Sequence, residues 1–170
     1  MRLVVQRVRR AEVRVENRVT GRIQHGLLVF VGVEDADTEA DVEWLAAKLA
    51  KLRIFADADG KMNADLAEVN GRLLVVSQFT LHAKTKKGNR PSYIRAAHPD
   101  HAIPLYEAFV RACARETGTD VETGEFGAAM EVDLLNDGPV TLWLDTKKQR
   151  VTHEHPVGLF HLLGRGPHPS

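Results

Sequence analysis

The sequence predicts a single α+β domain in which mostly antiparallel strands pack against two helices. With 170 residues, 44% of them hydrophobic, the chain can bury one well-packed core and is close to the usual size of one domain. Several short apolar segments alternate like strands between turn residues. Two longer segments repeat their apolar residues at helical spacing, which indicates amphipathic helices.

The first part of the chain, residues 2 to 33, is predicted to form strands. Apolar residues alternate along it at Leu3, Val5, Ala11, Val13 and Val15. Val8 breaks this alternation and indicates a β-bulge, and Glu16-Asn17-Arg18 is interpreted as a hairpin turn. Residues 27–31 are apolar on both faces, so their strand is expected to be central in its sheet, and Gly32 permits a close backbone neighbour at its end.

The first helix is predicted over about residues 38 to 52. Asp37-Thr38 offers an N-cap, and apolar residues follow at helical spacing at Val42, Leu45, Ala46, Leu49 and Leu52. This stripe is expected to pack on the sheet. Residues 57–60, Asp-Ala-Asp-Gly, are interpreted as a turn, because they lack the ligand spacing and the glutamate of a calcium-binding loop.

A second buried strand, residues 73–76, delivers the following polar segment to the point where the chain leaves the sheet. A basic loop from Lys84 to Arg90 then leads to a second helix, predicted from His98-Pro99-Asp100 to about Arg115, because proline suits the first helical turn.

The last two strands, near 121 to 135 and 139 to 145, flank four turn-forming residues, Asn136 to Pro139, which predict a tight hairpin. Residues 1–149 are expected to form the one domain. Residues 150–170 carry three prolines, three glycines and four histidines without a sustained period, and are expected to be a flexible C-terminal extension.

Composition sets limits on the function. Lys plus Arg and Asp plus Glu both number 23, so the net charge exerts no long-range attraction on a polyanion, and any nucleic-acid contact must be local. No 18-residue apolar run occurs and the N-terminus soon becomes charged, which predicts a cytoplasmic protein without a membrane partner. Cys113 is the only cysteine, so no internal disulfide or cysteine-based metal motif is expected.

Positive charge gathers in two segments, although such runs are usually solvated faces. The first segment holds Arg2, Arg7, Arg9, Arg10 and Arg14, and the second holds Lys84, Lys86, Lys87, Arg90 and Arg95. The histidine pairs 98/101 and 153/155 lack the acidic or cysteine partners expected of a zinc site. We therefore expect no metal and no other cofactor.

Two segments crowd small, polar and conformationally special residues together: residues 77–81, Ser-Gln-Phe-Thr-Leu, and residues 136–141, Asn-Asp-Gly-Pro-Val-Thr. They resemble the two signature motifs of the D-aminoacyl-tRNA deacylases, SQFTL and NxGPxT. Residues 60–63, 87–92 and 126–130 match further motifs in the family's order. Each motif alone is more often structural, but five in order over residues 1 to about 149 indicate the family. Tyr93 stands where the family usually has Phe, and Leu-His-Ala-Lys at 81–84 replaces its usual Leu-Tyr-Ala-Asp.

The resemblance implies a barrel-like core with the two main helices packed outside, and a homodimer that binds the 3′ acceptor end of D-aminoacyl-tRNA and no DNA. The implied reaction is hydrolysis of the ester that joins a D-amino acid, or mischarged glycine, to tRNA. Gly138-Pro139 is implied to be a cis peptide that enters the partner subunit's active site. Its main-chain oxygens would leave no space for the first side-chain carbon of an L residue, which makes it a chiral filter.

Individual roles follow from the same resemblance. The backbone N–H groups of Phe79 and Thr80 are implied as oxyanion donors. Ser77, Gln78 and Phe79 shape the adenosine pocket, and Met130 either forms a pocket wall or packs in the core. Lys86, Lys87 and Arg90 are the implied tRNA-binding residues.

Two alternatives stay open. Water assisted by the 2′-hydroxyl of the terminal adenosine is favoured as the attacking group over the Thr80 hydroxyl, because no motif guarantees the adjacent base that a hydroxyl nucleophile needs. The alternative function is a noncatalytic tRNA- or ribosome-binding module that uses the basic loop. Such a module has no need of a Gly-Pro filter facing an oxyanion pocket.

Overall fold

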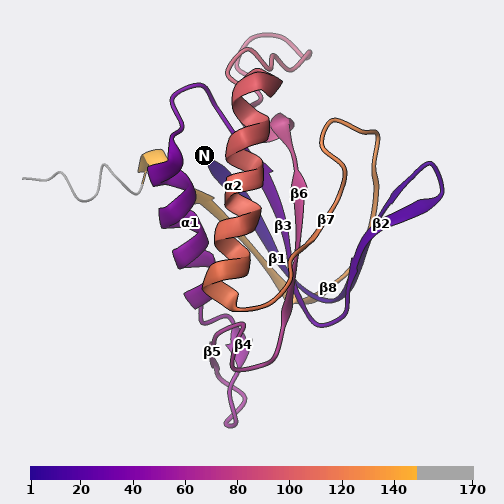
Figure 1. The fold of residues 1–170 in the computed structure, drawn as a ribbon, viewed down its shortest axis with the longest axis vertical. Coiled ribbons are helices and arrows are strands. Elements are labelled where there is room, and N and C mark those ends of the chain that lie inside the picture. Colours follow the sequence, from indigo (N-terminus) through magenta and orange to yellow (C-terminus); the bar gives the residue numbers. More distant parts are fainter. Residues whose placement is uncertain (149–170) are drawn as a thin grey trace, which may run out of the picture.

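The computed structural model describes residues 1–148, so the expected C-terminal extension lies outside the described residues. Within them the chain forms an α+β fold (Figure 1). Its elements are β1 (Arg2–Val15), β2 (Arg18–Ile23), β3 (Gly26–Gly32), α1 (Glu39–Lys51), β4 (Phe55–Ala56), β5 (Met62–Ala64), β6 (Arg72–Ser77), the 3₁₀ helix η1 (Phe79–His82), α2 (Pro99–Thr117), β7 (Glu122–Thr123) and β8 (Glu131–Asp145).

The long strand β1 organises the sheet. One of its edges pairs antiparallel with β3 through Arg2–Val8 and then with β2 through residues 11–15, while the other edge pairs antiparallel with β8. The sheet continues from β3 to β6 and β7 in parallel, so β3 is central, as its apolar run predicts. The register between β1 and β8 shifts on both sides of Val8, which confirms the predicted bulge.

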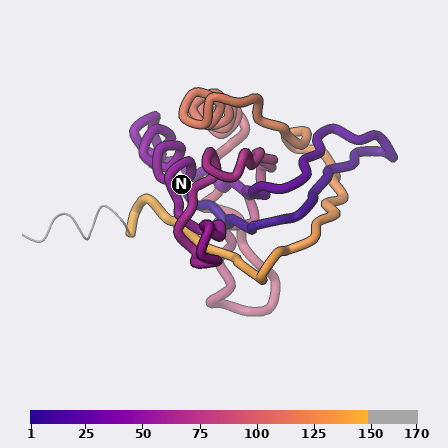
Figure 2. The backbone as a smooth tube through the Cα atoms, turned by 90° about the horizontal axis from the view of Figure 1, so that it is seen from below, coloured from indigo at the N-terminus to yellow at the C-terminus, as the bar shows by residue number. Residues whose placement is uncertain are grey.

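Both predicted helices are present and lie side by side on one face of the curved sheet (Figures 1 and 2). Helix α1 begins after Thr38, whose backbone N–H donates to the Asp41 carboxylate over 2.8 Å. Helix α2 begins with Pro99 and ends at Gly118, which has the left-handed conformation (φ 69°) that glycine adopts without strain. Among residues 1–148, no helix combines the length and hydrophobicity needed to span a bilayer.

The two faces of the sheet bury separate clusters, because side chains alternate along each strand. Leu27, Val29 and Val75 belong to the large cluster that also takes in the helices, whereas Leu28 and Leu74 belong to a smaller cluster on the opposite face. The backbone of β2 approaches β7, where the Arg22 N–H donates to Glu122 over 3.4 Å. The sheet is therefore curled almost to closure with both helices outside, and the predicted fold class is confirmed.

The predicted hairpin between residues 121–135 and 139–145 is wrong. β7 has only two residues, and β8 runs on from Glu131 to Asp145 without reversing, because both of its halves pair with the 14-residue β1. Val8 faces Asn136 and Gln6 faces Thr141, so residues 137–140 form an outward bulge opposite Arg7. We call residues 137–140 the Gly-Pro bulge.

Candidate active site

The segment Ser77 to Thr80 leaves the sheet at the end of β6 and turns at once into η1. Gly32, at the end of the neighbouring strand β3, makes this turn compatible with close packing. A Cβ built on Gly32 would lie 2.9 Å from the Leu81 side chain and 3.1 Å from the Gln78 carbonyl oxygen, closer than atoms normally approach. The close backbone neighbour expected at Gly32 is therefore η1 itself.

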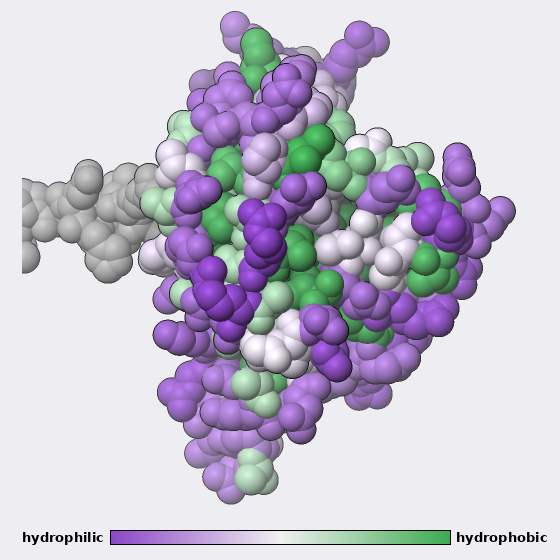
Figure 3. Space-filling model, in the orientation of Figure 1, coloured by the Kyte–Doolittle hydropathy of each residue, from purple (hydrophilic) through white to green (hydrophobic). Residues whose placement is uncertain are grey.

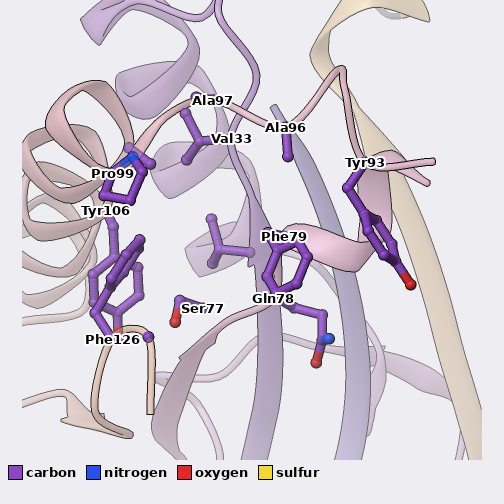
Figure 4. Close-up of a pocket in the computed structure, with 13 residues that line it drawn as sticks. Val33, Ser77, Gln78, Phe79, Tyr93, Ala96, Ala97, Pro99, Tyr106 and Phe126 are labelled. Atoms are coloured by element: carbon purple, nitrogen blue, oxygen red, sulfur yellow. The ribbon is translucent and has the colours of Figure 1, made fainter. Parts of the chain in front are cut away.

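A cavity of about 380 Å³ opens beside this turn, within the size range of small-molecule sites. Its lining comes from Val31, Val33, Ser77, Gln78, Phe79, Tyr93, Ala96, Ala97, Pro99, Ala102, Tyr106, Phe126 and Gly127. Figure 4 shows Phe126 and Tyr106 on one side, Phe79 and Tyr93 on the other, and Ser77 between them. Mostly apolar walls with few polar groups suit a flat aromatic ligand such as a nucleobase.

Phe79 and Thr80 are the first two residues of η1, where backbone N–H groups have no acceptor within the helix. The Thr80 hydroxyl accepts a hydrogen bond from the Gln78 side-chain amide over 2.5 Å. An amide N–H can only donate, so this neighbour cannot remove the hydroxyl proton. The geometry thus leaves two backbone donors available and gives the Thr80 hydroxyl a partner that does not activate it.

The last residue of η1, His82, forms a buried ionisable pair with Glu34. The His82 ring is 1% exposed, and its Nδ1 lies 3.5 Å from a carboxylate oxygen of Glu34, which is also buried. Burial lowers the pKa of His82 below its usual value, so the ring is neutral near pH 7. Burial acts to raise the pKa of Glu34, but the nearby positive groups, chiefly Lys147, together outweigh burial and the pKa is lowered.

Arg7 holds the Gly-Pro bulge from below. Its Nε donates to the Asp137 carbonyl oxygen over 3.2 Å, and its Nη1 donates to the Ile54 carbonyl oxygen over 2.6 Å. Asn136 closes the neck of the bulge, because its side-chain amide donates to the carbonyl oxygens of Arg7 (3.0 Å) and Val140 (3.1 Å). The bulge is therefore a clamped loop rather than a loose turn.

Glycine is the only residue type that fits at position 138. Its φ of +123° lies in a region that L side chains rarely adopt, and a Cβ there would come within 2.9 Å of both the Arg7 guanidinium and the Val140 side chain. The peptide bond from Gly138 to Pro139 is cis. Neither residue lines the cavity beside η1 in the same chain.

The two basic segments differ in how their charges are balanced. Each arginine of the first is paired with a carboxylate: Arg2 with Asp145, Arg7 and Arg9 with Asp137, Arg10 with Asp133, and Arg14 with Glu12. No salt bridge within residues 1–148 uses Lys84, Lys86, Lys87, Arg90 or Arg95, all of which are exposed, and no acidic residue lies between 84 and 95. Only the second segment offers an uncompensated positive surface.

The structure places Ser77, Gln78 and Phe79 in the lining of the cavity, and Thr80 follows them in the chain, so their role in binding adenosine stays a prediction. Met130 packs with the small cluster and does not line the cavity, so its contact with substrate stays a prediction. Phe126 and Tyr106 as cavity walls and Arg7 as the clamp were not predicted from the sequence, although the motif at 126–130 was a signal for Phe126. Within residues 1–148, no group of three or more His, Cys, Asp or Glu side chains is placed to hold a metal ion.

Comparison with known proteins identifies relatives along nearly the whole described chain. The family model described as D-Tyr-tRNA(Tyr) deacylase matches residues 4–145. Proteins named D-aminoacyl-tRNA deacylase from Flavobacterium johnsoniae and Akkermansia muciniphila are 57% and 58% identical over 149 residues, which cover 88% of this chain and 99% of each relative. A solved structure titled c-Myc DNA Unwinding Element Binding Protein superposes with a TM-score of 0.80 at 35% identity, covering 86% of this chain and 99% of that one. The chain belongs to the D-Tyr-tRNA(Tyr) deacylase family.

Proposed function

We propose that the protein hydrolyses D-aminoacyl-tRNA, and mischarged glycyl-tRNA, to free tRNA and amino acid, and spares L-aminoacyl-tRNA. The observation that carries this function is the aromatic cavity that ends at two unpaired backbone donors, found in a chain of this family. The terminal adenosine lies in the cavity between Phe79 and Phe126. The ester carbonyl then lies at the start of η1.

The chemistry at this site requires no protein nucleophile. A water molecule, assisted by the adenosine 2′-hydroxyl, adds to the ester carbonyl carbon, and the N–H groups of Phe79 and Thr80 stabilise the oxyanion that forms. Collapse breaks the bond from the carbonyl carbon to the ribose 3′-oxygen, which takes up the proton. The Thr80 hydroxyl helps to fix the geometry through Gln78, in agreement with the bond between them.

Chiral selection in this proposal comes from Gly138-Pro139 of a second subunit. The bulge is absent from the lining of its own chain's cavity, so it must reach a cavity of another copy to act as a filter. Strand β8 offers the means of association. In the described chain it pairs only with β1, which leaves its other edge open, and Leu135 and Trp143 on it are 45% and 46% exposed. A long open edge with exposed apolar side chains is a surface on which a second copy pairs.

Dimer formation can be measured directly. We expect sedimentation equilibrium to give twice the chain mass of 18.9 kDa, and Trp143→Lys to weaken association because a charge would be buried between the subunits. Arg115→Lys, on helix α2, which lies on the opposite side of the fold from β8 (Figure 2), is the surface control. A wild-type protein that sediments as a monomer at micromolar concentration would contradict the filter in trans.

The 3′ acceptor end of the tRNA is held by the basic loop, residues 84–90, through Lys86, Lys87 and Arg90. Its support is the uncompensated charge of that loop, in contrast to the paired arginines of β1. Because the overall charge is zero, the contact with nucleic acid must be local. The activity belongs in the cytoplasm, where charged tRNA is used.

The test is release of labelled amino acid from D-tyrosyl-tRNA, L-tyrosyl-tRNA and glycyl-tRNA by purified protein. We expect rapid release of D-tyrosine and glycine, and no enzyme-dependent release of L-tyrosine. Equal release of both tyrosine enantiomers would contradict the chiral filter. Binding of tRNA without any hydrolysis would favour the noncatalytic module instead.

A further inference from the structure

An exposed aromatic pair lies at the mouth of the cavity. Phe79 and Tyr93 are 57% and 40% exposed, although each is large and mostly apolar. Their ring centroids are 5.0 Å apart with an angle of 76° between the ring planes. This edge-to-face arrangement leaves at least one face of each ring uncovered by the other. Figure 4 shows Tyr93 on the far side of Phe79 from Phe126, with its hydroxyl pointing away from the cavity.

The basic loop begins and ends beside this pair. The backbone N–H of Lys84 donates to the Ser92 carbonyl oxygen over 2.7 Å, and the Ser92 N–H donates back to Lys84 over 2.9 Å. These two bonds close the loop, so Tyr93 follows directly from its base and the positive side chains project beyond it. Hydrophilic residues cover most of the face in Figure 3, and the hydrophobic ones come to the surface beside α2.

We propose that Tyr93 is a stacking surface for the cytidine that precedes the terminal adenosine of tRNA, and that the basic loop neutralises the phosphates on either side of it. The inference rests on the proposed function and adds a second nucleotide subsite to it. A positively charged groove with exposed aromatic rings is the usual means of holding single-stranded nucleic acid. The 3′ end of tRNA is single-stranded, and its strand must pass the cavity mouth once the adenosine is inside.

The charge arrangement favours this occupant over a protein partner. Within residues 1–148, the five positive side chains between 84 and 95 take part in no salt bridge and have no acidic neighbour in the sequence, whereas the β1 arginines are each neutralised. Phosphates supply the missing negative charge at regular spacing. The aromatic rings then contribute stacking that does not depend strongly on base identity, which suits an enzyme that acts on many tRNAs.

The test compares two substrates: full-length D-tyrosyl-tRNA, and D-tyrosyl-adenosine, which lacks the preceding nucleotides. We expect Tyr93→Ala to lower kcat/KM on the tRNA about tenfold to a hundredfold more than on the adenosine ester, as expected for loss of one stacked base. Tyr93→Phe keeps the ring and should stay close to wild type on both. Lys86→Gln with Lys87→Gln should reduce the salt dependence on tRNA alone, whereas Lys61→Gln, on the distant β4–β5 hairpin, should not.

Three results would overturn the inference. Tyr93→Ala could lower kcat/KM equally on both substrates, which would mean that the ring only supports Phe79. Tyr93→Phe could lower kcat/KM on the tRNA as much as Tyr93→Ala does, which would assign the effect to the hydroxyl. The loop variants could leave the salt dependence unchanged. A wild-type protein that hydrolyses neither substrate gives a different pattern and would refute the proposed function itself.

Discussion

Arg7→Lys tests whether the clamp beneath the Gly-Pro bulge sets chiral rejection. The bulge can make room for an L side chain only by moving, and moving it breaks the bonds from Arg7 to the Asp137 carbonyl (3.2 Å) and indirectly loosens the one to Ile54 (2.6 Å). Lysine keeps the charge but lacks the fork, so it can satisfy only one of the two carbonyls.

The expected effect follows from the lost bond. A hydrogen bond from a charged group contributes about 1.5–3 kcal/mol. Taking about 2 kcal/mol for one lost bond, the ratio of kcat/KM for D- over L-tyrosyl-tRNA should fall about 30-fold. The same loss should lower Tm by about 4–8 °C for a chain of this size. L-substrate hydrolysis should rise, while D-substrate hydrolysis stays close to wild type.

The assay is single-turnover release of labelled tyrosine from both enantiomeric substrates, with a thermal melt on each protein. Arg9→Lys is the matched control, because Arg9 is 71% exposed and reaches Asp137 only through the carboxylate at 3.6 Å. An Arg7→Lys protein with a lowered Tm but an unchanged D/L ratio would refute the link between clamp and selectivity. An equal loss of hydrolysis of D- and L-tyrosyl-tRNA would instead assign Arg7 a role in substrate binding.

Three further predictions concern the chemistry, the tRNA contact and the pH response. Thr80→Val should keep kcat within about threefold, because the hydroxyl has no base beside it; a loss of about a thousandfold or more would indicate a nucleophile. Arg90→Ala should weaken tRNA binding and make the salt dependence shallower, whereas Lys61→Ala should change neither, and identical slopes would discard the phosphate contact. Because burial lowers the pKa of His82, the unfolded chain binds a proton at this histidine at a higher pH than the folded chain does. The free energy of unfolding should therefore be at its full value above about pH 6.5 and fall as the pH drops below it. Urea midpoints at pH 7.5 and 5.5 should therefore differ, and the difference should shrink in His82→Gln; the lowered pKa of Glu34 acts in the same direction, but only below its ordinary value of 4.5.

Local patterns in the sequence were sufficient for most individual elements. The structure has the bulge at Val8, the turn at Glu16-Asn17, the central strand and both helices where expected. Each of these features depends on residues that are close to one another in the sequence. The same local reasoning failed at residues 136–139. Their composition is that of a turn, but β1 is long enough to pair with the chain on both sides of them.

The site was only partly predictable for a similar reason. Ser77 to Thr80 could be placed because they directly follow a buried strand. The motif at 126–130 marked Phe126 but could not place it at the cavity, because its position depends on a contact between separate segments. Its ring packs against that of Tyr106, with the centroids 5.7 Å apart. Which arginines are neutralised could not be predicted from the sequence either, because the carboxylates that pair with Arg2, Arg7 and Arg10 lie more than 120 positions away.

In the proposed dimer, one subunit supplies the cavity and the other supplies the filter. This arrangement can be tested with heterodimers, purified through two different tags, of Phe79→Ala, which lacks a working cavity, and Arg7→Lys, which has a loosened filter. The only working cavity then belongs to the Arg7→Lys chain and faces the intact filter of the Phe79→Ala chain. We expect these heterodimers to reject L-tyrosyl-tRNA as wild type does while they hydrolyse D-tyrosyl-tRNA. Heterodimers with the same lowered D/L ratio as the Arg7→Lys homodimer would contradict this arrangement.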